Sequence, residues 1–453
     1  MTRLVRPVRL VCPVRRSVLT ATLAALPLAL ALTSSACRAQ DRAARDTARV
    51  RAVVDSLLPR LQLLTGLTEE HPIRIGYRTR AEVHAYVTHQ LDKDMPPAEA
   101  AGLEGTYAAL GLIPDTLHLR RLLLDLYTEQ VSGYYDPETK TFYTVEGTPP
   151  DMLRTVLAHE LVHALQDQHT NLDSIISPRR GNDRESAAQA AVEGQATAVM
   201  FAVVTEEALH APVDPTKLPD LGAQLRPAIE AQNSQFPVYR RAPRIVREAL
   251  VFPYLQGAAF VQALWRNSMR PSATATTLRG VAAATPAGAA PAAWPAPLDS
   301  LLPQSTEQVM HPERFLRSRD NPTELLLAPA PDERWRTVYE NVMGEMETTV
   351  FLRQHLGETA NARGWDGDRF RLMEGPGGAR ALVWYSVWDD AASADAFAAA
   401  YRATLLKRPG RQTLVDRLTV ANRPVVRVVD TSSALVPSAV PVPELQALVG
   451  GVP

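Results

Sequence analysis

Residues 159–169 read HELVHALQDQH, which places His159 and His163 four positions apart with Glu160 between them. Residues four apart on an α-helix differ by about 40° in direction, so both imidazoles can reach one ion from a single face. Glu160 points beside that pair and can reach a water bound to the ion. Leucines at positions 153, 157, 161 and 165 form a stripe on another face. The pattern predicts a metal-binding helix anchored in a core.

His169 ends the same stretch, and its role decides which kind of site is built. In the pattern HExxHxxGxxH the last histidine binds, because a Gly ends the helix and turns the chain between the second and third histidines. This sequence has Gln166 at that place and no Gly before Gly181. If the helix continues, His169 lies about 240° round from His163 and faces away. We therefore expect His169 outside the ligand set.

A second pattern takes its third ligand, a glutamate, from another helix, and the Ala-rich segment 185–207 is the best candidate. Glu185 lies 22 residues after His163, nearer the spacing usual in thermolysin-like proteins, whereas Glu193 lies 30 residues after it. Glu193 sits in an otherwise apolar stretch, where an ionised carboxylate needs a metal or a partner. Glu185 adjoins several charged residues and can be a solvated helix start. We predict Glu193 as the ligand and keep Glu185 as the alternative.

The chain before the motif predicts helices and one hairpin. Apolar spacing predicts helices over 42–64, 80–91, 98–110 and 117–130, and strands over 73–77, 133–135 and 141–145. The turn sequence DPETK joins the last two strands into a hairpin directly before the motif helix. Thr148 fits the N-cap of that helix, with Pro149 as its first residue and Asp151 completing a capping box.

The first 37 residues have the pattern of an export signal. Several arginines precede an apolar run over 17–32, which is short for a membrane span and leads to Ser-Ser-Ala-Cys. We expect a lipoprotein-type signal peptide over 1–37, and an exported protein in the periplasm or cell envelope that is anchored through a lipid on Cys37. Ordinary secretion with Cys37 removed is the alternative. The other cysteine, Cys12, lies in the leader, so the mature chain has no internal disulfide.

Beyond residue 331 the pattern changes to mixed helices and strands. Helices are expected over 338–356 and 391–406, and strands over 369–373, 381–388, 413–420 and 424–429. This mixture predicts a small C-terminal α+β domain over 332–453. The Ala/Pro-rich segment 270–303 has too few large apolar residues to pack, and it is expected to be a linker or loop.

The motifs together resemble a known family. His159-Glu160-Leu-Val-His163 with Glu193-Gly-Gln-Ala resembles the gluzincin branch of zinc metallopeptidases, and GYYDP, VEGQAT, FPYLQG and STEQVMHP resemble a group of bacterial exported zincin-like proteins. The resemblance implies Zn²⁺ and an overall α+β fold. It implies a mainly helical zincin-like domain with a small β-hairpin or sheet over 129–320, after an N-terminal helical region over 38–128. Thr197 stands where that family often has an Asp.

These residues predict an exported zinc-dependent peptidase. Three protein ligands leave zinc one position for water, which is the catalytic arrangement, and Glu160 is the expected general base. The strand over 141–145 could pair with an extended peptide or protein substrate. Tyr254 and His311 are candidates to stabilise the oxyanion.

Two other functions stay open. One is a non-catalytic zincin-fold binding or scaffold protein with a structural zinc, and the other is a zinc amidase that acts on cell-wall peptides. The net charge of -1 gives no electrostatic footprint for nucleic acid. We expect membrane contact only through the possible lipid anchor on Cys37.

Overall fold

The computed structural model describes residues 47–149, 152–177, 181–268 and 302–449. The described residues from Val50 onward form one compact unit. The expected signal peptide with Cys37, nearly all of the segment 270–303, and Asp151 lie outside the described residues.

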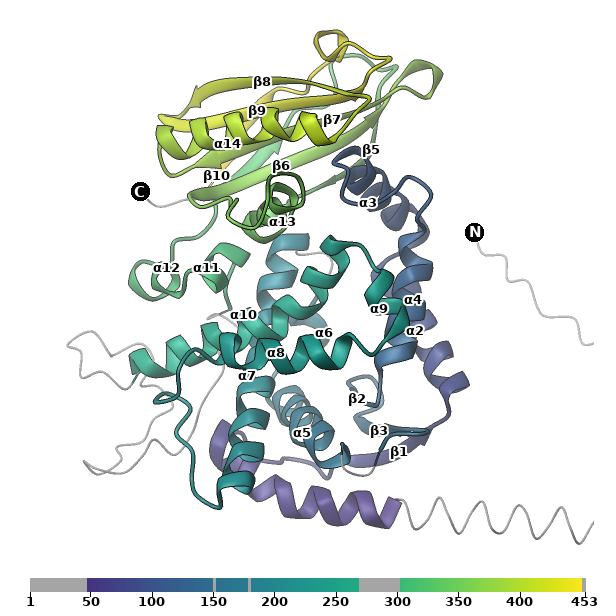
Figure 1. Cartoon of the computed structure of the whole chain (residues 1–453), viewed down its shortest axis with the longest axis vertical. Helices are drawn as coiled ribbons and strands as arrows, with labels where there is room; N and C mark the ends of the chain where they lie inside the picture. Colours follow the sequence, from purple (N-terminus) through teal and green to yellow (C-terminus); the bar gives the residue numbers. More distant parts are fainter. Residues whose placement is uncertain (1–46, 150–151, 178–180, 269–301, 450–453) are drawn as a thin grey trace, which may run out of the picture. The chain divides into compact units, whose positions relative to one another are not determined.

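Helices dominate the chain up to residue 317 (Figure 1). A helix whose described part covers residues 47–65 is followed by α2 (Arg80–Asp94), α3 (Pro97–Ala109), α4 (Leu119–Gln130), α5 (Leu153–His169), α6 (Leu172–Ile175), α7 (Asn182–Leu209), α8 (Leu221–Asn233), α9 (Pro237–Arg241), α10 (Arg244–Ser268), α11 (Thr306–Met310) and α12 (Pro312–Arg317). Strands dominate the chain after residue 320, so the expected α+β class is confirmed.

A small three-stranded sheet contains the hairpin expected before the motif helix. β2 (Gly133–Asp136) and β3 (Thr141–Val145) are antiparallel, and β1 (Arg74–Arg78) pairs with β3 in parallel. The order β1-β3-β2 leaves β3 in the centre, with a neighbour on each side. The prediction that residues 141–145 receive a substrate strand is therefore wrong, because only β1 and β2 are edges of this sheet.

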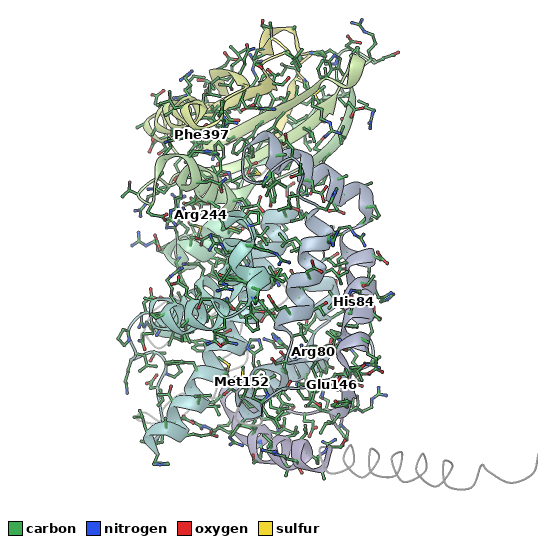
Figure 2. The ribbon with its side chains drawn as sticks, turned by 45° about the vertical axis from the view of Figure 1, so that its right-hand side comes forward. Arg80, His84, Glu146, Met152, Arg244 and Phe397 are labelled. Carbon is green, nitrogen blue, oxygen red and sulfur yellow. The ribbon has the colours of Figure 1, made fainter. Side chains whose placement is uncertain are left out.

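A side chain from α2 closes the end of the helix that precedes this hairpin. Arg80, labelled in Figure 2, donates from Nη1 to the carbonyl of Val131 at 2.7 Å and to that of Thr128 at 3.3 Å. Carbonyls in the last turn of a helix have no partner within the helix, and a cationic side chain satisfies them well. Arg80 thus stabilises the end of α4, just before β2 begins.

The C-terminal part is built on a five-stranded antiparallel sheet of order β5-β6-β7-β9-β8. Its elements are β5 (Arg336–Asn341), α13 (Gly344–Leu356), β6 (Trp365–Glu374), β7 (Arg380–Trp388), α14 (Ala391–Thr404), β8 (Arg411–Val420) and β9 (Arg423–Ser432). β4 (Glu324–Leu327) and β10 (Leu445–Val449) form a separate antiparallel pair. The helix expected over 338–356 is wrong at its start, because residues 338–341 pair with β6 as a strand.

Both faces of β7 are buried, which explains its nearly continuous apolar sequence. Trp384 and Trp388 pack on the side of α13 and α14, in the same core as the N-terminal helices. Val383, Tyr385 and Val387 belong to a second core on the opposite face. A strand that is covered on both faces loses the alternation of polar and apolar residues.

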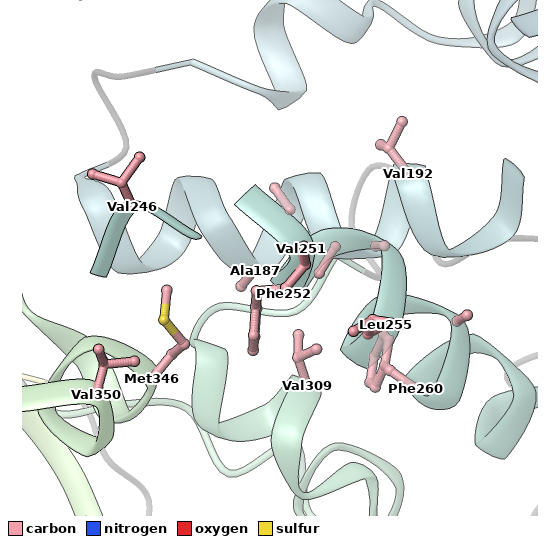
Figure 3. Packing of buried hydrophobic residues seen from close by; sticks show 14 of the residues in the cluster. Ala187, Val192, Val246, Val251, Phe252, Leu255, Phe260, Val309, Met346 and Val350 are labelled. Atoms are coloured by element: carbon pink, nitrogen blue, oxygen red, sulfur yellow. The ribbon is translucent and has the colours of Figure 1, made fainter. Parts of the chain in front are cut away.

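Two glycines let α7 and α10 cross at very short range. A Cβ on Gly194 of α7 would lie 2.8 Å from Gly257 Cα, and a Cβ on Gly257 would overlap the carbonyl oxygen of Ala190. Figure 3 shows side chains of both helices, among them Val192 and Leu255, in the core that surrounds this crossing. The small residues of α7 thus allow close packing against α10. No helix was predicted from the sequence at the position of α10.

Among the described residues, α7 alone is long and apolar enough to span a membrane by length and composition. However, 72% of its most apolar window is buried inside the protein. A core helix passes the same test, so this property is weak evidence for a membrane span.

Candidate metal centre

α5 carries the motif, and its leucine face lies in the protein core. Leu157, Leu161 and Leu165 are fully buried, and Leu153 is 9% exposed. The stripe that the sequence predicted is therefore buried, and it leaves the opposite side of α5 for polar chemistry.

The start of α5 differs from the sequence expectation. The helix begins at Leu153, after Met152, and has no side-chain cap. Thr148 is not the N-cap, since its hydroxyl donates to the carbonyl of Ser132. That bond holds the segment before α5 against the start of β2, a tertiary contact that the local capping pattern could not reveal.

Three side chains from two helices converge beside the buried face of α5. Glu193 Oε2, from α7, lies 3.0 Å from His159 Nε2 and 3.3 Å from His163 Nε2, both from α5. The two Nε2 atoms lie 3.1 Å apart, and the three groups can offer ligand atoms within 4.8 Å of one another. These side chains are only 12% to 14% exposed. The sequence-predicted ligands thus share one small, largely buried site.

The protonation of the cluster follows from charge pairing that outweighs burial. Burial acts to raise the pKa of Glu193, but the imidazoles of His163 and His159 hold that pKa well below its ordinary range. Burial acts to lower the pKa of His163, but the carboxylates of Glu193 and Glu160 raise that pKa to about 9. A metal cation would replace the proton on this imidazole, so proton release would accompany binding.

Glu160 is held beside the ligand cluster by the backbone of β2. Its Oε2 accepts the N–H of Tyr135 at 2.9 Å. Burial raises the pKa of Glu160, and Glu193 adds to the rise while both histidines oppose it. A raised pKa brings a carboxylate closer to neutral pH, where a general base works best. A divalent cation in the cluster would pull this pKa back down.

Gln166 contacts the cluster, although no such role was predicted for it from the sequence. Its Oε1 lies 2.8 Å from His163 Nδ1, and its side chain is fully buried. A residue three positions after a ligand shares its face of a helix, one turn on, so spacing carried a signal. The role was not predicted because position 166 entered the argument only as the place where a Gly would have ended the helix.

The two alternative ligands lie elsewhere. His169 ends α5, and its Nε2 bonds the carbonyl of Thr68 at 2.8 Å. Glu185 is two helical turns before Glu193 on α7, and the charges that act on it are those of Asp94 and Glu99. Burial, followed by these two charges, raises the pKa of Glu185 to about 7. Neither side chain reaches the imidazole pair.

The two candidates for oxyanion stabilisation lie in different parts of the structure. The ring of Tyr254, from α10, lies 5.9 Å from that of His159. The charge of Glu193, followed by burial and Glu160, raises the pKa of Tyr254 well above its ordinary value, so its hydroxyl stays protonated. His311 instead pairs with Glu345 at 2.9 Å, near the start of α7. Only Tyr254 lies at the cluster.

Thr197 is buried one turn after Glu193 on α7, at 2% exposure. Its Oγ1 has no hydrogen-bond partner among the described residues. Position 197 carries no carboxylate, so the hydrogen bonds that orient the candidate ligands come from other side chains.

The residues present fit a metal ion of intermediate softness. Imidazole and carboxylate donors suit zinc and neighbouring transition metals, whereas calcium and magnesium prefer oxygen ligands alone. The donors come from two helices that pack together, so the site forms only in the folded chain. Within the described residues, this is the one group of three or more such side chains that converges closely enough to hold an ion.

Comparison with known proteins adds information on the C-terminal part only. Residues 333–447 match the model of a family described as a domain of unknown function, DUF8575. No curated protein and no solved structure matches the chain significantly. The matched range falls inside the expected C-terminal domain, and none of the residues of the candidate metal centre belongs to it.

Proposed function

We propose that the chain is an exported zinc-dependent peptidase in which His159, His163 and Glu193 hold the zinc. The proposal rests above all on Glu193 Oε2, which lies 3.0 Å and 3.3 Å from the two imidazole nitrogens. Two imidazoles and one carboxylate are a donor set of catalytic zinc sites, where one position stays open for water. When bound, zinc supplies a Lewis acid and lowers the pKa of a water to about 7.

Glu160 is the proposed general base. The N–H of Tyr135 holds Oε2, which leaves Oε1 to take a proton from the attacking water and to pass it to the leaving amine. The donor of this hydrogen bond is a backbone group of β2, so the sheet orients the base. The position of the base is thus set before a substrate arrives.

β2 is the proposed docking strand for an extended peptide. The N–H of Tyr135 points away from β3 toward α5. Gly133, two residues earlier, has its backbone groups on the same side, because strand backbone alternates with a period of two. A substrate strand could therefore pair with the edge of β2 that lies beside Glu160.

Tyr254 is the proposed donor to the developing oxyanion. Its hydroxyl is protonated at neutral pH, and it belongs to a helix that crosses α7 beside Glu193. A neutral donor in a largely buried site can stabilise negative charge on the former carbonyl oxygen. The required proximity comes from the Gly194–Gly257 crossing, one turn along α10 from Tyr254.

The test is Glu160→Gln, measured by bound zinc and by hydrolysis of a peptide library at pH 7. The substitution keeps the size and the acceptor for Tyr135, so zinc content should stay unchanged. Hydrolysis should fall by about 10²- to 10⁴-fold, because the base is lost. Glu207→Gln, which changes a side chain of α7 that is 42% exposed, serves as the control.

Other outcomes would favour the alternatives. If the unmodified protein bound zinc and cleaved no peptide, a binding or scaffold protein with a structural zinc would replace the peptidase. If it cleaved only cell-wall peptides, a zinc amidase would be the better description.

The proposal includes export to the periplasm or cell envelope and a lipid on Cys37. It rests on the order of basic, apolar and small residues that precede Cys37. Mass spectrometry of the protein from membranes should find acyl chains on a polypeptide that begins at this residue. A mature chain that begins after Cys37 would contradict the anchor and leave the peptidase unaffected.

A further inference from the structure

Gln166 is a fully buried amide between the two helices that supply the candidate ligands. Its Oε1 lies 2.8 Å from His163 Nδ1, and its Nε2 donates to the carbonyl of Val192 at 3.1 Å. The same Nε2 donates to Gln195 Oε1 at 2.8 Å. One side chain of α5 is thus bonded to a ligand of its own helix and to the turn of α7 that carries Glu193.

These bonds fix which way the amide points. The carbonyl of Val192 is only an acceptor, so the amide nitrogen must face it and the amide oxygen must face His163. His163 Nδ1 therefore carries a hydrogen in both the neutral and the charged form of the ring. The lone pair that can bind a metal is left on Nε2, the nitrogen that lies 3.3 Å from Glu193 Oε2.

The bonds also fix the rotation of the imidazole and the spacing of the two helices. Without the acceptor at Gln166, the ring of His163 could turn about its last side-chain torsion. The bond to Val192 holds α5 against the residue directly before Glu193. Because the amide is neutral, it adds no charge to a site that already contains the carboxylates of Glu160 and Glu193.

We propose that Gln166 is a positioning residue for the metal: it orients His163 through Nδ1 and holds the α5 ligands at binding distance from Glu193. This inference rests on the proposed zinc site, but the orientation of the ring is a property of the folded chain alone. Loss of such an outer hydrogen bond lowers metal affinity by about 10- to 100-fold in metalloproteins.

The test compares Gln166→Met and Gln166→Glu with the control Gln168→Met in the full chain. Methionine has nearly the length of glutamine but accepts no strong hydrogen bond, whereas a carboxylate keeps an acceptor for Nδ1. Gln168 is two residues further on α5, and its amide bonds the backbone of Glu70 and His71, away from the cluster. Zinc affinity is measured by competition with a chelator, and the Nδ1–H of His163 by ¹⁵N NMR, assigned with His163→Ala.

We expect Gln166→Met to bind zinc about 10- to 100-fold more weakly and to lose a slowly exchanging Nδ1–H signal. Gln166→Glu should keep that signal, and Gln168→Met should match the unmodified protein in both measurements. Unchanged zinc affinity in Gln166→Met, or a rapidly exchanging Nδ1–H in the unmodified protein, would overturn the proposal. If the unmodified protein showed the protected Nδ1–H but bound no zinc, the proposed zinc function would fail while the orienting role of Gln166 stood.

Discussion

Two glutamates on one helix show how strongly surroundings decide the role of a residue. Glu193 lies beside two imidazoles that keep it ionised, whereas Glu185, two turns earlier, is subject to the negative charges of Asp94 and Glu99. At the level of sequence, spacing favoured Glu185 and the apolar surroundings favoured Glu193. Burial was the better guide to which carboxylate meets the histidines, because a buried charge needs a partner of opposite sign.

Replacing these two carboxylates one at a time should separate their roles. We expect Glu193→Gln to lose most bound zinc, because a neutral amide is a poor metal ligand in place of a carboxylate. Glu185→Gln should keep the zinc content of the unmodified protein. Metal analysis after dialysis checks both variants, and equal zinc in the two would rule out Glu193 as a ligand.

Tyr254→Phe should leave zinc binding intact and lower turnover. Removal of one oxyanion donor costs about 10²- to 10³-fold in kcat in well-studied hydrolases. KM should change little, because the donor acts on charge that develops only in the transition state. Steady-state kinetics with zinc-loaded protein provide the measurement, and an unchanged kcat would show that Tyr254 only packs against His159.

At the scale of elements, the site depends on how closely α7 and α10 approach. Helix axes that cross this closely need residues without side chains at the contact, which Gly194 and Gly257 provide. The crossing brings Tyr254 of α10 to the turn of α7 that carries Glu193. The glycines of VEGQAT and FPYLQG are thus parts of one contact, although 63 positions separate them in the chain.

Gly257→Ala should damage both stability and activity. Its Cβ would overlap the backbone of Ala190, so the helices would have to separate. Such overpacking costs about 1–3 kcal/mol in the free energy of unfolding. Urea unfolding measures the loss, and turnover should fall with it because Tyr254 moves together with α10.

A second helical glycine offers the matched control. A Cβ on Gly105 of α3 would meet mainly the end of the Leu372 side chain, at 2.7 Å, and no backbone atom. Gly105→Ala should therefore cost less than Gly257→Ala, because the end of a side chain can shift further than helix backbone, whereas the gain in helix propensity of about 1 kcal/mol applies to both. An equal loss in both variants would mean that the crossing tolerates a methyl group.

At the scale of the whole molecule, α3 joins the N-terminal helices to the C-terminal sheet. The carbonyls at its end accept hydrogen bonds from Gln354 and His355 of α13 and from Arg408. In addition, Tyr107 donates to Glu347 Oε1 at 2.7 Å, and both side chains are buried. The segment that matches the DUF8575 model is therefore packed against the helical part through specific polar contacts.

The buried contact between Tyr107 and Glu347 should make the free energy of unfolding depend on pH. Burial raises the pKa of Glu347 from 4.5 to about 8, and Glu347 Oε2 has no hydrogen-bond partner among the described residues. Between these pH values the unfolded chain loses this proton while the folded chain keeps it. Stability therefore falls as pH rises from about 5 to about 8, by at most roughly 1.4 kcal/mol per pH unit for this group.

Glu347→Gln should remove this contribution, because an amide needs no proton to remain neutral. The free energy of unfolding of the variant minus that of the unmodified protein should be larger at pH 8 than at pH 5. Urea unfolding of both proteins at the two pH values measures this difference. The remaining slope would come from other buried carboxyls, such as Asp183, whose pKa burial raises to about 7. The same stability difference at both pH values would contradict this assignment.

Sequence alone determined the features that depend on neighbours along the chain. Helical spacing identified α5 and the pairing of His159 with His163, and turn residues located the hairpin. Gln166 in place of a glycine predicted that α5 continues through His169, as observed. These features follow from periodicity and local backbone chemistry, which the order of residues specifies directly.

Only the tertiary structure decided what distant segments do to one another. It placed β1 beside β3, which leaves β1 and β2 as the two edges of the sheet, and it turned Thr148 toward Ser132 instead of the helix start. It also brought Gln166 to Val192 and Tyr254 to His159, contacts that depend on the packing of separate helices. Such contacts follow from close approach between surfaces, and local periodicity carries no information about which surfaces meet.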